Sequence, residues 1–447
     1  MELNYLKLSV CFAVLTAILS VSVAYAGTVT TLPQEIVTAS SDKEDTTLLS
    51  PGTVTVVKPE EMSGEQKNLP ELLKHVPGLH VVEARGRGAY TVASVRGSTA
   101  AEVSVFVDGT LMNLGGEAAV DLSAIPVDNV ERIEVYRGYI PARFSGASMG
   151  GVINIITKKP VKPGGSVSVG GGSYGLFKSG LSYVSPLGKG KLLFGTNYEK
   201  TDGDFSYWND ADKPYTPSDG YNASRQNNGY KKADILIKWN DDHWQLRGGW
   251  KKDDRDLPYQ APGNDRHDSR PGAHQKTDTF DFSAARRQKS GNLEWGLKID
   301  YINQDKKYDN EHEANTGGVG EVHNEYKNDR LGVTIDGSYS IGENNLLEFL
   351  ADFSHEKLKA EGDITQALNA ITDYSRDAWN LQLQDTINLN KEGSFWITPL
   401  LRYNASDGDG KFSWNVALSR KFGDHWTLKA SGGQQRLFHI LWPTDRL

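Results

Sequence analysis

Residues 161 to about 433 alternate between apolar and polar side chains, and this pattern limits the possible folds more than any other feature. One segment places apolar residues at every second position: Leu293, Trp295, Leu297, Ile299 and Tyr301. A period of two gives each β-strand one apolar and one polar face. The connections alternate between short turns and long loops, as in transmembrane β-barrels. The pattern therefore predicts about thirteen antiparallel barrel strands of ~10 residues each.

The composition favours a barrel over a helical membrane protein. The sequence has 46 Gly, 10 Trp and 19 Tyr, and its mean hydropathy is −0.50. After the first thirty or so residues, no run approaches the ~18 apolar residues that a membrane helix needs. A soluble β-sandwich also alternates, but it does not explain long and short connections in regular turn.

The barrel is expected to be incomplete. Single-chain bacterial barrels have even strand counts, and an open sheet edge in lipid leaves backbone groups unpaired. The alternation stops near Gly433, and residues 434–447 do not follow it. We expect a partial barrel of roughly 13 strands at 161–433, followed by a C-terminal tail at 434–447 that does not continue the barrel pattern.

The N-terminus has the features of an export signal at residues 1–26. Lys7 precedes an apolar core, Leu8–Val23, and Ala24-Tyr25-Ala26 is a small-x-small cleavage site. Cleavage would remove Cys11, the one cysteine, so disulfides and cysteine metal sites are not expected. The polar, Thr/Ser-rich leader at 27–50 is expected to be flexible.

Residues 51–160 read as a compact α+β domain. A helix is expected over Leu69–His75, ended by Pro77-Gly78. The β-rich runs are Val54–Val57, Leu79–Val82, Val92–Arg96, Val103–Val107, Val130–Val135 and Gly151–Thr157. About 110 residues of this kind can bury one modest core.

The charged residues favour neither catalysis nor nucleic-acid binding. The net charge is −8 and no basic patch stands out, so no nucleic-acid partner is expected. No nucleophile–base pair or metal-ligand spacing rises above background. We predict no enzyme activity, no catalytic residue, no metal site and no cofactor.

Five segments in residues 51–160 carry a family resemblance. They are Leu69–Leu79, Val95–Gly97, Val105–Gly109, Ile125–Gly138 and Ala147–Thr157. In this order they resemble the plug domain of TonB-dependent outer-membrane receptors. The resemblance implies a plug domain at 51–160 followed by a barrel, and since plugged transporters have about 22 strands, this chain would hold roughly 13 of about 22. It also implies a monomer in the outer membrane of a Gram-negative cell, in contact with outer-membrane lipid.

The resemblance also implies an energy-coupling segment near the mature N-terminus. Glu35, Ile36, Val37, Thr38 and Ala39 resemble this TonB box. An extended segment can add to the edge of a partner sheet through main-chain hydrogen bonds. The implied partner is TonB, with its proton-driven inner-membrane complex.

Two groups of plug residues are candidates for function. Outward-facing loops would offer ligand contacts at Arg85, Arg87, Tyr90, Met112 and Asn113. Polar contacts between plug and barrel are expected from Arg96, Glu131, Arg132 and Glu134. Ordinary loop solvation is the alternative for the first group, and structural ion pairs are the alternative for the second.

The resemblance implies import of a scarce metal-chelate ligand, energised through TonB. Ferric siderophores form the largest ligand class of the family and are the first choice. Cobalamin (vitamin B12) is the alternative, because Gln435–Pro443 faintly resembles a box that we associate with cobalamin receptors. Two further alternatives are a non-functional truncated receptor and a passive porin or adhesin without energy coupling.

Overall fold

The computed structural model describes 50–62, 68–84, 87–115, 117, 119–146, 148–209, 220–225, 227–257, 273–310, 322–342, 344–366, 372–390, 392–423 and 426–436. The predicted export signal, the TonB box and residues 437–447 of the predicted tail lie outside these residues. In the part of the chain that is described, no helix is long and apolar enough to cross a membrane.

The predicted plug, residues 51–160, is built on a five-stranded sheet. Its strand order is β1 (Thr53–Val57), β6 (Val130–Arg137), β7 (Gly151–Thr157), β4 (Val103–Val107) and β5 (Thr110–Leu111). Only β4 and β7 run parallel to each other; the other pairs in this sheet are antiparallel. A separate hairpin joins β2 (Leu79–Glu83) to β3 (Thr91–Val95). The strands predicted for this segment are all present, with ends within about two residues of the predicted ones.

Helix α3 (Leu69–Leu73) is shorter than the predicted Leu69–His75. Asn68 and Glu71 form a capping box at its N-terminus, and its leucines are buried. The helix stops early because Pro77 disfavours the helical conformation at Val76. Four short 3-10 helices complete the helical elements described: η1 (Pro59–Met62), η2 (Ala100–Glu102), η3 (Leu122–Ala124) and η4 (Asp363–Gln366).

The main apolar core belongs to the plug. It joins helix α3 to the inner strands of the five-stranded sheet, and its most buried members are Leu69, Leu73, Ile133, Val135, Ile153 and Ile155, each 0 % exposed. Among the described residues, every member of this cluster lies between Val57 and Ile155. The plug therefore has a core of its own.

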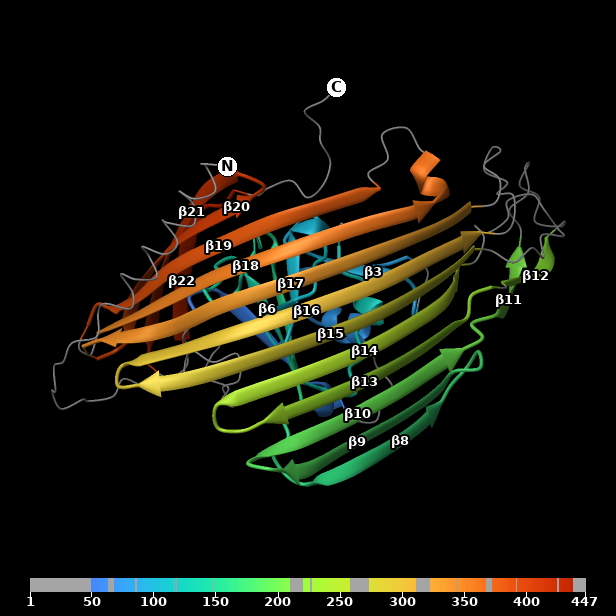
Figure 1. The fold of residues 1–447 in the computed structure, drawn as a ribbon, viewed down its shortest axis with the longest axis horizontal. Coiled ribbons are helices and arrows are strands. Elements are labelled where there is room, and N and C mark those ends of the chain that lie inside the picture. Colours follow the sequence, from blue (N-terminus) through green and yellow to red (C-terminus); the bar gives the residue numbers. More distant parts are fainter. Residues whose placement is uncertain are drawn as a thin grey trace. The chain divides into compact units, whose positions relative to one another are not determined.

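A second sheet contains 13 antiparallel strands, as predicted (Figure 1). The strands are β8 (Gly164–Gly171), β9 (Phe177–Leu187), β10 (Gly190–Thr201), β13 (Tyr230–Asn240), β14 (Trp244–Leu257), β15 (Ala273–Ser290), β16 (Leu293–Asn310), β17 (Val322–Ile341), β18 (Asn345–Gly362), β19 (Asp373–Asn388), β20 (Phe395–Ser406), β21 (Asp409–Phe422) and β22 (Trp426–Gln434). Between β10 and β13 lies a small hairpin of β11 (Phe205–Asn209) and β12 (Tyr221–Arg225). Strands β8 and β22 lie at the two ends of the sheet and are not paired with each other in the described chain, so the barrel is not closed.

The strands in the middle of this sheet are longer than the ~10 residues expected. β15, β16 and β18 have 18 residues each, and β17 has 20. The ladder continues beyond the apolar stretch, for example where Lys306 pairs with Tyr326. The alternation of apolar residues marks the lipid-facing part of a strand, whereas backbone pairing needs no apolar face.

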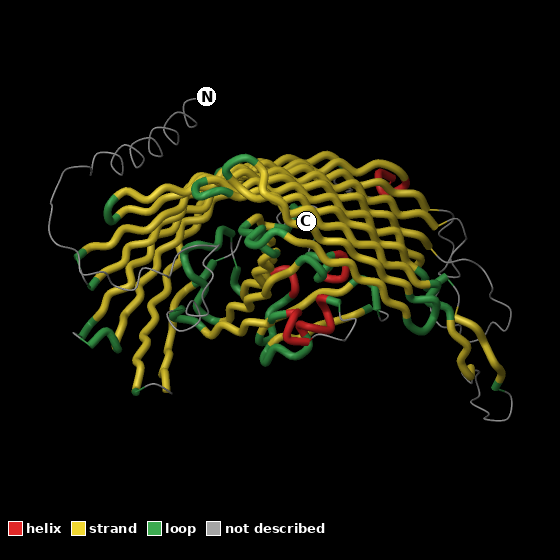
Figure 2. Tube along the Cα trace, turned by 90° about the horizontal axis from the view of Figure 1, so that it is seen from below, coloured by secondary structure: helices red, strands yellow, loops and turns green. Residues whose placement is uncertain are grey.

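Figure 2 shows the plug against one face of the 13-stranded sheet, and we call this sheet the wall. The face of the wall toward the plug is polar: Arg330 is 1 % exposed, while the next residue, Leu331, points to the other face and is 47 % exposed. The long connections lie at one end of the strands and most of the short turns at the other. We call these the long-loop end and the short-turn end.

Candidate functional site

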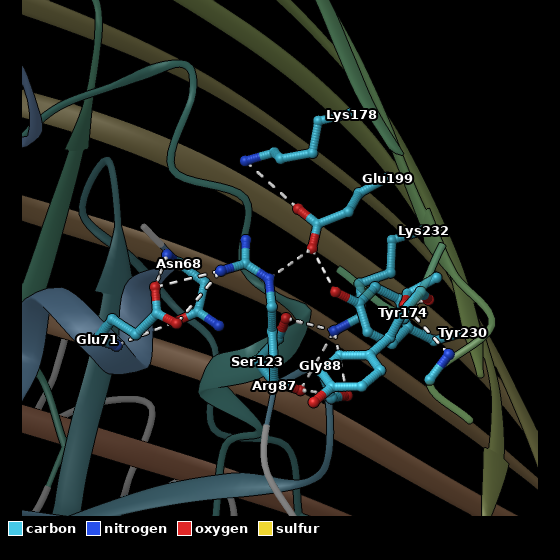
Figure 3. Close-up of polar contacts among 12 residues, drawn as sticks. Asn68, Glu71, Arg87, Gly88, Ser123, Tyr174, Lys178, Glu199, Tyr230 and Lys232 are labelled. Carbon is cyan, nitrogen blue, oxygen red and sulfur yellow. Dashed lines mark hydrogen bonds and ion pairs between the residues drawn. The ribbon is translucent and has the colours of Figure 1, made fainter. Parts of the chain in front are cut away.

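The loop between β2 and β3 contacts the wall near its long-loop end through Arg87. The guanidinium lies between two carboxylates: Nε is 3.2 Å from Glu199 Oε1 on β10, and Nη1 is 3.2 Å from Glu71 Oε1 on α3 (Figure 3). Glu71 also accepts the backbone N–H of Asn68 in the capping box. Charge-assisted hydrogen bonds are roughly twice as strong as neutral ones. Arg87 thus connects this loop to a plug helix and to the wall at once.

Gly88 makes this approach possible. Its φ is +79°, and an added Cβ would lie 2.2 Å from the ring of Tyr230. The Tyr230 hydroxyl donates to Glu199, and Lys178 Nζ lies 3.3 Å from the same carboxylate. Glu199 therefore holds one plug side chain and two wall side chains in a single polar group.

Two wall cations bind the plug loop that contains η3. Lys232 Nζ on β13 donates to the Ser123 carbonyl at 2.7 Å and to the Gly88 carbonyl at 3.3 Å (Figure 3). Arg255 Nη2 on β14 lies 2.8 Å from Asp121 Oδ2. Asp121 also caps its own loop by accepting the Ser123 N–H at 3.0 Å. The loop after β2 is thereby fixed to β10 and β13, and the loop that contains η3 is fixed to β13 and β14.

Two of the predicted ligand-contact residues, Arg87 and Tyr90, lie near this network. Arg87 is engaged with carboxylates, as above. Tyr90 is 41 % exposed, and its hydroxyl lies 3.5 Å from the Ala119 carbonyl. Burial raises the pKa of Tyr90, and two nearby carboxylates, Asp121 and Glu117, raise it further. Arg85 lies outside the described residues. Ligand contact by these residues stays a prediction.

The other two predicted ligand contacts lie beyond β5. Asn113 binds the backbone of β4, accepting from Val105 N at 2.8 Å and donating to Val103 O at 3.0 Å, so its amide is used to hold this turn. Met112 packs on the plug core and also lines a crevice between plug and wall. An ion pair between Glu117 and Lys306 on β16 crosses that crevice. Of Met112 and Asn113, Met112 is the residue that borders the crevice.

The residues predicted for polar contacts between plug and wall form bonds within the plug. Arg132 lies 2.7 Å from Glu131 and 2.9 Å from Glu134, which also accepts the Tyr136 hydroxyl at 2.8 Å. Burial acts to raise the pKa of Glu134, but Arg143, Tyr136 and Arg132 outweigh it and hold the pKa below its usual range. A role for these residues across the interface stays a prediction.

Arg96 has a φ of 51°, in the left-handed region. Its guanidinium lies over Gly138, where an added Cβ would be 3.2 Å from Nη1. Arg137 lies nearby and donates to Thr55; burial lowers the pKa of Arg137, and the charge of Arg96 lowers it further. Contact of Arg96 with the wall also stays a prediction.

Toward the short-turn end, Asp108 binds two cations of the wall, and we call this group the Asp108 cluster. Oδ1 lies 3.3 Å from Lys238 Nζ on β13, and Oδ2 lies 3.2 Å from Arg247 Nε on β14. Thr157 donates its N–H to Asp108 at 3.0 Å and its hydroxyl at 2.5 Å. Arg247 also pairs with Asp281 on β15. The cluster is almost fully buried, so these charges depend on one another.

Acid is expected to weaken the Asp108 cluster. Burial acts to raise the pKa of Asp108, but Lys238, Arg247 and Thr157 lower it more, so it lies below its usual value. Such a carboxylate stabilises the folded state above its unfolded pKa of about 4, and this stabilisation disappears as the pH falls through the lower folded-state pKa. Hydrogen exchange at Gly109, corrected for its intrinsic rate, should stay constant from neutral pH to about 4 and increase below it. An increase that begins near neutral pH would contradict this assignment.

Strands β19 and β20 hold the plug differently, mainly through its backbone. Gln382 donates to the Phe144 carbonyl at 2.6 Å, and Gln384 accepts the Ala142 N–H at 3.1 Å. Arg402 donates to the Ile140 carbonyl. On this side, wall side chains bind mainly plug carbonyls and amides, and Tyr139 and Ala142 of the plug pack on Leu400 and Ala417 of the wall. The contacts of β10 to β16 are mostly charged.

Sequence reasoning singled out Arg87, as a ligand contact, but missed the other residues that join plug and wall. Asp108 lies in one of the family segments and Asp121 in a plug loop, but neither was singled out. The wall partners Glu199, Lys232 and Lys238 occupy inward positions of alternating strands, which the period of two could have revealed. Their plug partners could not be found this way, because alternation carries no information about which loop lies opposite.

Comparison with known proteins agrees with this architecture. The family model described as "TonB-dependent Receptor Plug Domain" matches residues 47–152. The chain is 31 % identical over 226 residues to a "Vitamin B12 transporter BtuB" of Photobacterium profundum, covering 47 % of this chain and 34 % of that protein. It is 33 % identical over 175 residues to the protein of that name from Vibrio cholerae, covering 38 % and 28 %. The chain spans about a third of the length of these curated relatives.

Solved structures share the fold at lower identity. The siderophore receptor PirA of Acinetobacter baumannii superposes with a TM-score of 0.66 at 16 % identity, covering 87 % of this chain and 61 % of that one. The ferric enterobactin receptor PfeA of Pseudomonas aeruginosa superposes with a TM-score of 0.65 at 20 % identity, covering 89 % and 62 %. At these identities the likeness establishes the fold alone.

Proposed function

Because the chain belongs to the TonB-dependent receptors, we propose that it binds a metal chelate and imports it across the outer membrane when TonB acts on the plug. One observation carries this proposal. The plug has a separate apolar core. It meets the wall mainly through ion pairs and hydrogen bonds of its loops, such as Arg87–Glu199 and Asp108–Lys238, and through one small apolar cluster that includes Tyr139 and Leu400. Polar contacts of this kind can be exchanged for water, so the plug can move while the wall stays folded.

The coupling to TonB is assigned to Glu35–Ala39. These residues precede the first plug strand, β1, and have the composition of a segment that adds to a partner sheet edge. The outward-facing apolar residues of the 13-stranded sheet would contact outer-membrane lipid, and the receptor would act as a monomer. The alternating faces of the strands support this placement.

The ligand class has two candidates. Ferric siderophores were the first choice from the sequence, as the largest ligand class of the family. Cobalamin is favoured by a specific observation, because the two curated relatives described above are named vitamin B12 transporters. The siderophore receptors among the solved structures are too distant in sequence to support a ligand.

Uptake by whole cells tests the proposal. The chain would be expressed in a Gram-negative host that lacks its own receptors for both ligands, and the cells given cobalt-labelled cyanocobalamin or iron-labelled ferric enterobactin. We expect uptake of one ligand, lost in a strain without TonB and lost with Val37→Pro, because proline removes a main-chain donor from the pairing segment. Thr30→Pro, upstream of the box, is the matched control.

Two other results would redirect the interpretation. Uptake that persists without TonB would indicate a passive pore. Ligand binding to cells without any uptake would favour the alternative of a receptor fragment that recognises its ligand but does not transport it.

A further inference from the structure

Lys238 and Arg247 form a pair of cations on the wall. They are directly opposite each other on β13 and β14, and their side chains are 1 % and 6 % exposed. The wall supplies one carboxylate to this pair, Asp281, which binds Arg247. Asp281 has room because Gly249 lies opposite it, where an added Cβ would be 2.7 Å from Oδ1. Within the cluster, the wall alone therefore has two cations for one carboxylate.

The plug provides the second carboxylate. Asp108 touches both cations, at 3.3 and 3.2 Å, and its side chain is 3 % exposed. Its backbone lies in the left-handed region, with a φ of 48°, so the turn is shaped to direct this side chain. A buried charge without its partner is strongly destabilising. The wall cations are thus balanced only while the plug occupies its place.

A cavity between plug and wall begins beside this cluster. Asp108 and Gly109 are among the residues that line it. Four of the other lining residues are cations and two are carboxylates: Arg143, Arg286, Arg287, Lys298, Glu134 and Asp336. Lys298 donates to the Gly109 carbonyl, so the turn that carries Asp108 is held from the cavity side as well. An acidic molecule in this cavity would lie next to Asp108.

We propose that Lys238 and Arg247 are an oxyanion site of the wall, occupied by the Asp108 carboxylate at rest and by an acidic group of the ligand once the plug turn moves. The site would take the oxygens of a carboxylate or phosphate, which suit an ammonium and a guanidinium side by side. The inference rests on the proposed function, because it assigns a binding site to a ligand that would pass between plug and wall.

A cysteine reporter tests whether an oxyanion competes with Asp108. The sequence has one cysteine, Cys11, so Cys11→Ser combined with Thr110→Cys gives a single thiol next to the Asp108 turn. Thr110 is 1 % exposed. In the detergent-solubilised full chain, inorganic phosphate should raise the rate of maleimide labelling roughly tenfold over chloride at equal ionic strength, a factor typical of losing one charged hydrogen bond. In the Lys238→Gln/Arg247→Gln background, labelling should be fast and independent of phosphate. Equal rates in phosphate and chloride would overturn the proposal.

Direct binding of phosphate gives a second measurement. Asp108→Asn vacates the site, so this variant should bind phosphate roughly tenfold more tightly than the wild type by calorimetry. Adding Arg247→Gln should remove the gain. Asp128→Asn is the matched control, since Asp128 is a more exposed plug carboxylate 3.6 Å from Lys178. Equal phosphate affinity in Asp108→Asn and the wild type would refute the site. Both measurements use purified protein, so a failure of ligand uptake leaves them unaffected.

Discussion

Replacing Asp300 by alanine is expected to lower the free energy of unfolding of the 13-stranded sheet by about 2–3 kcal/mol, because the buried Arg330 loses the nearer of its two described carboxylate partners and keeps only Glu356, at 3.6 Å. Asp300 on β16 binds Arg330 on β17, and both side chains are 1 % exposed. Gly332 leaves space for this carboxylate, since an added Cβ there would lie 2.7 Å from Asp300 Oδ2. Denaturant unfolding followed by tryptophan fluorescence measures the effect, because all 10 tryptophans lie outside the plug.

Two controls separate burial of the charge from loss of the pair. Asp300→Ala combined with Arg330→Met removes both charges and should recover much of the loss, because apolar replacement of a buried pair is often neutral. Asp377→Ala breaks an exposed pair with His355, in which the side chains are 59 % and 46 % exposed, and should cost less than ~1 kcal/mol. Equal losses for Asp300→Ala and Asp377→Ala would show that burial is not the cause.

The fold could be read from the sequence because alternation acts residue by residue. Leu297 and Ile299 face outward and Lys298 inward whatever the rest of the chain does, so strand number and direction followed directly. The length of the strands could not be derived from the alternation. Beyond Ile302, β16 continues through Lys306 to Asn310 with mostly polar residues on both faces. A strand without an apolar face pairs as well as one with it, so the pattern marks the lipid boundary and misses the strand end.

The interface could be read only in part, because its contacts join distant positions. Arg87 was identified as an outward-facing plug residue, but its partner Glu199 lies 112 positions away. The pairing of Lys238 with Arg247 follows from strand register. The contact of these two cations with Asp108 depends instead on how the plug packs against the wall. Local patterns fix which side chains face inward. The packing of two separate units decides which of them meet.

Leu73→Ala in helix α3 is the second large effect we expect, a loss of about 2–5 kcal/mol from the stability of the plug. Leu73 is 0 % exposed in the plug core, so truncation leaves a cavity and removes apolar contacts. Hydrogen exchange of the β6 and β7 amides in the centre of the plug sheet measures this loss. Val161→Ala, at a site that is 54 % exposed, is the matched control and should change little.

Leu73→Ala also tests whether plug and wall unfold as one unit. The plug contains no tryptophan, so the fluorescence transition reports on the wall. The described members of the main core lie in the plug alone, and Asp108 and Arg87 meet the wall through polar contacts. Leu73→Ala should therefore speed exchange in β6 and β7 while leaving the tryptophan transition in place. An equal shift of both would mean that the wall depends on the plug for its own stability. Movement of the plug past a wall that stays folded would then be ruled out.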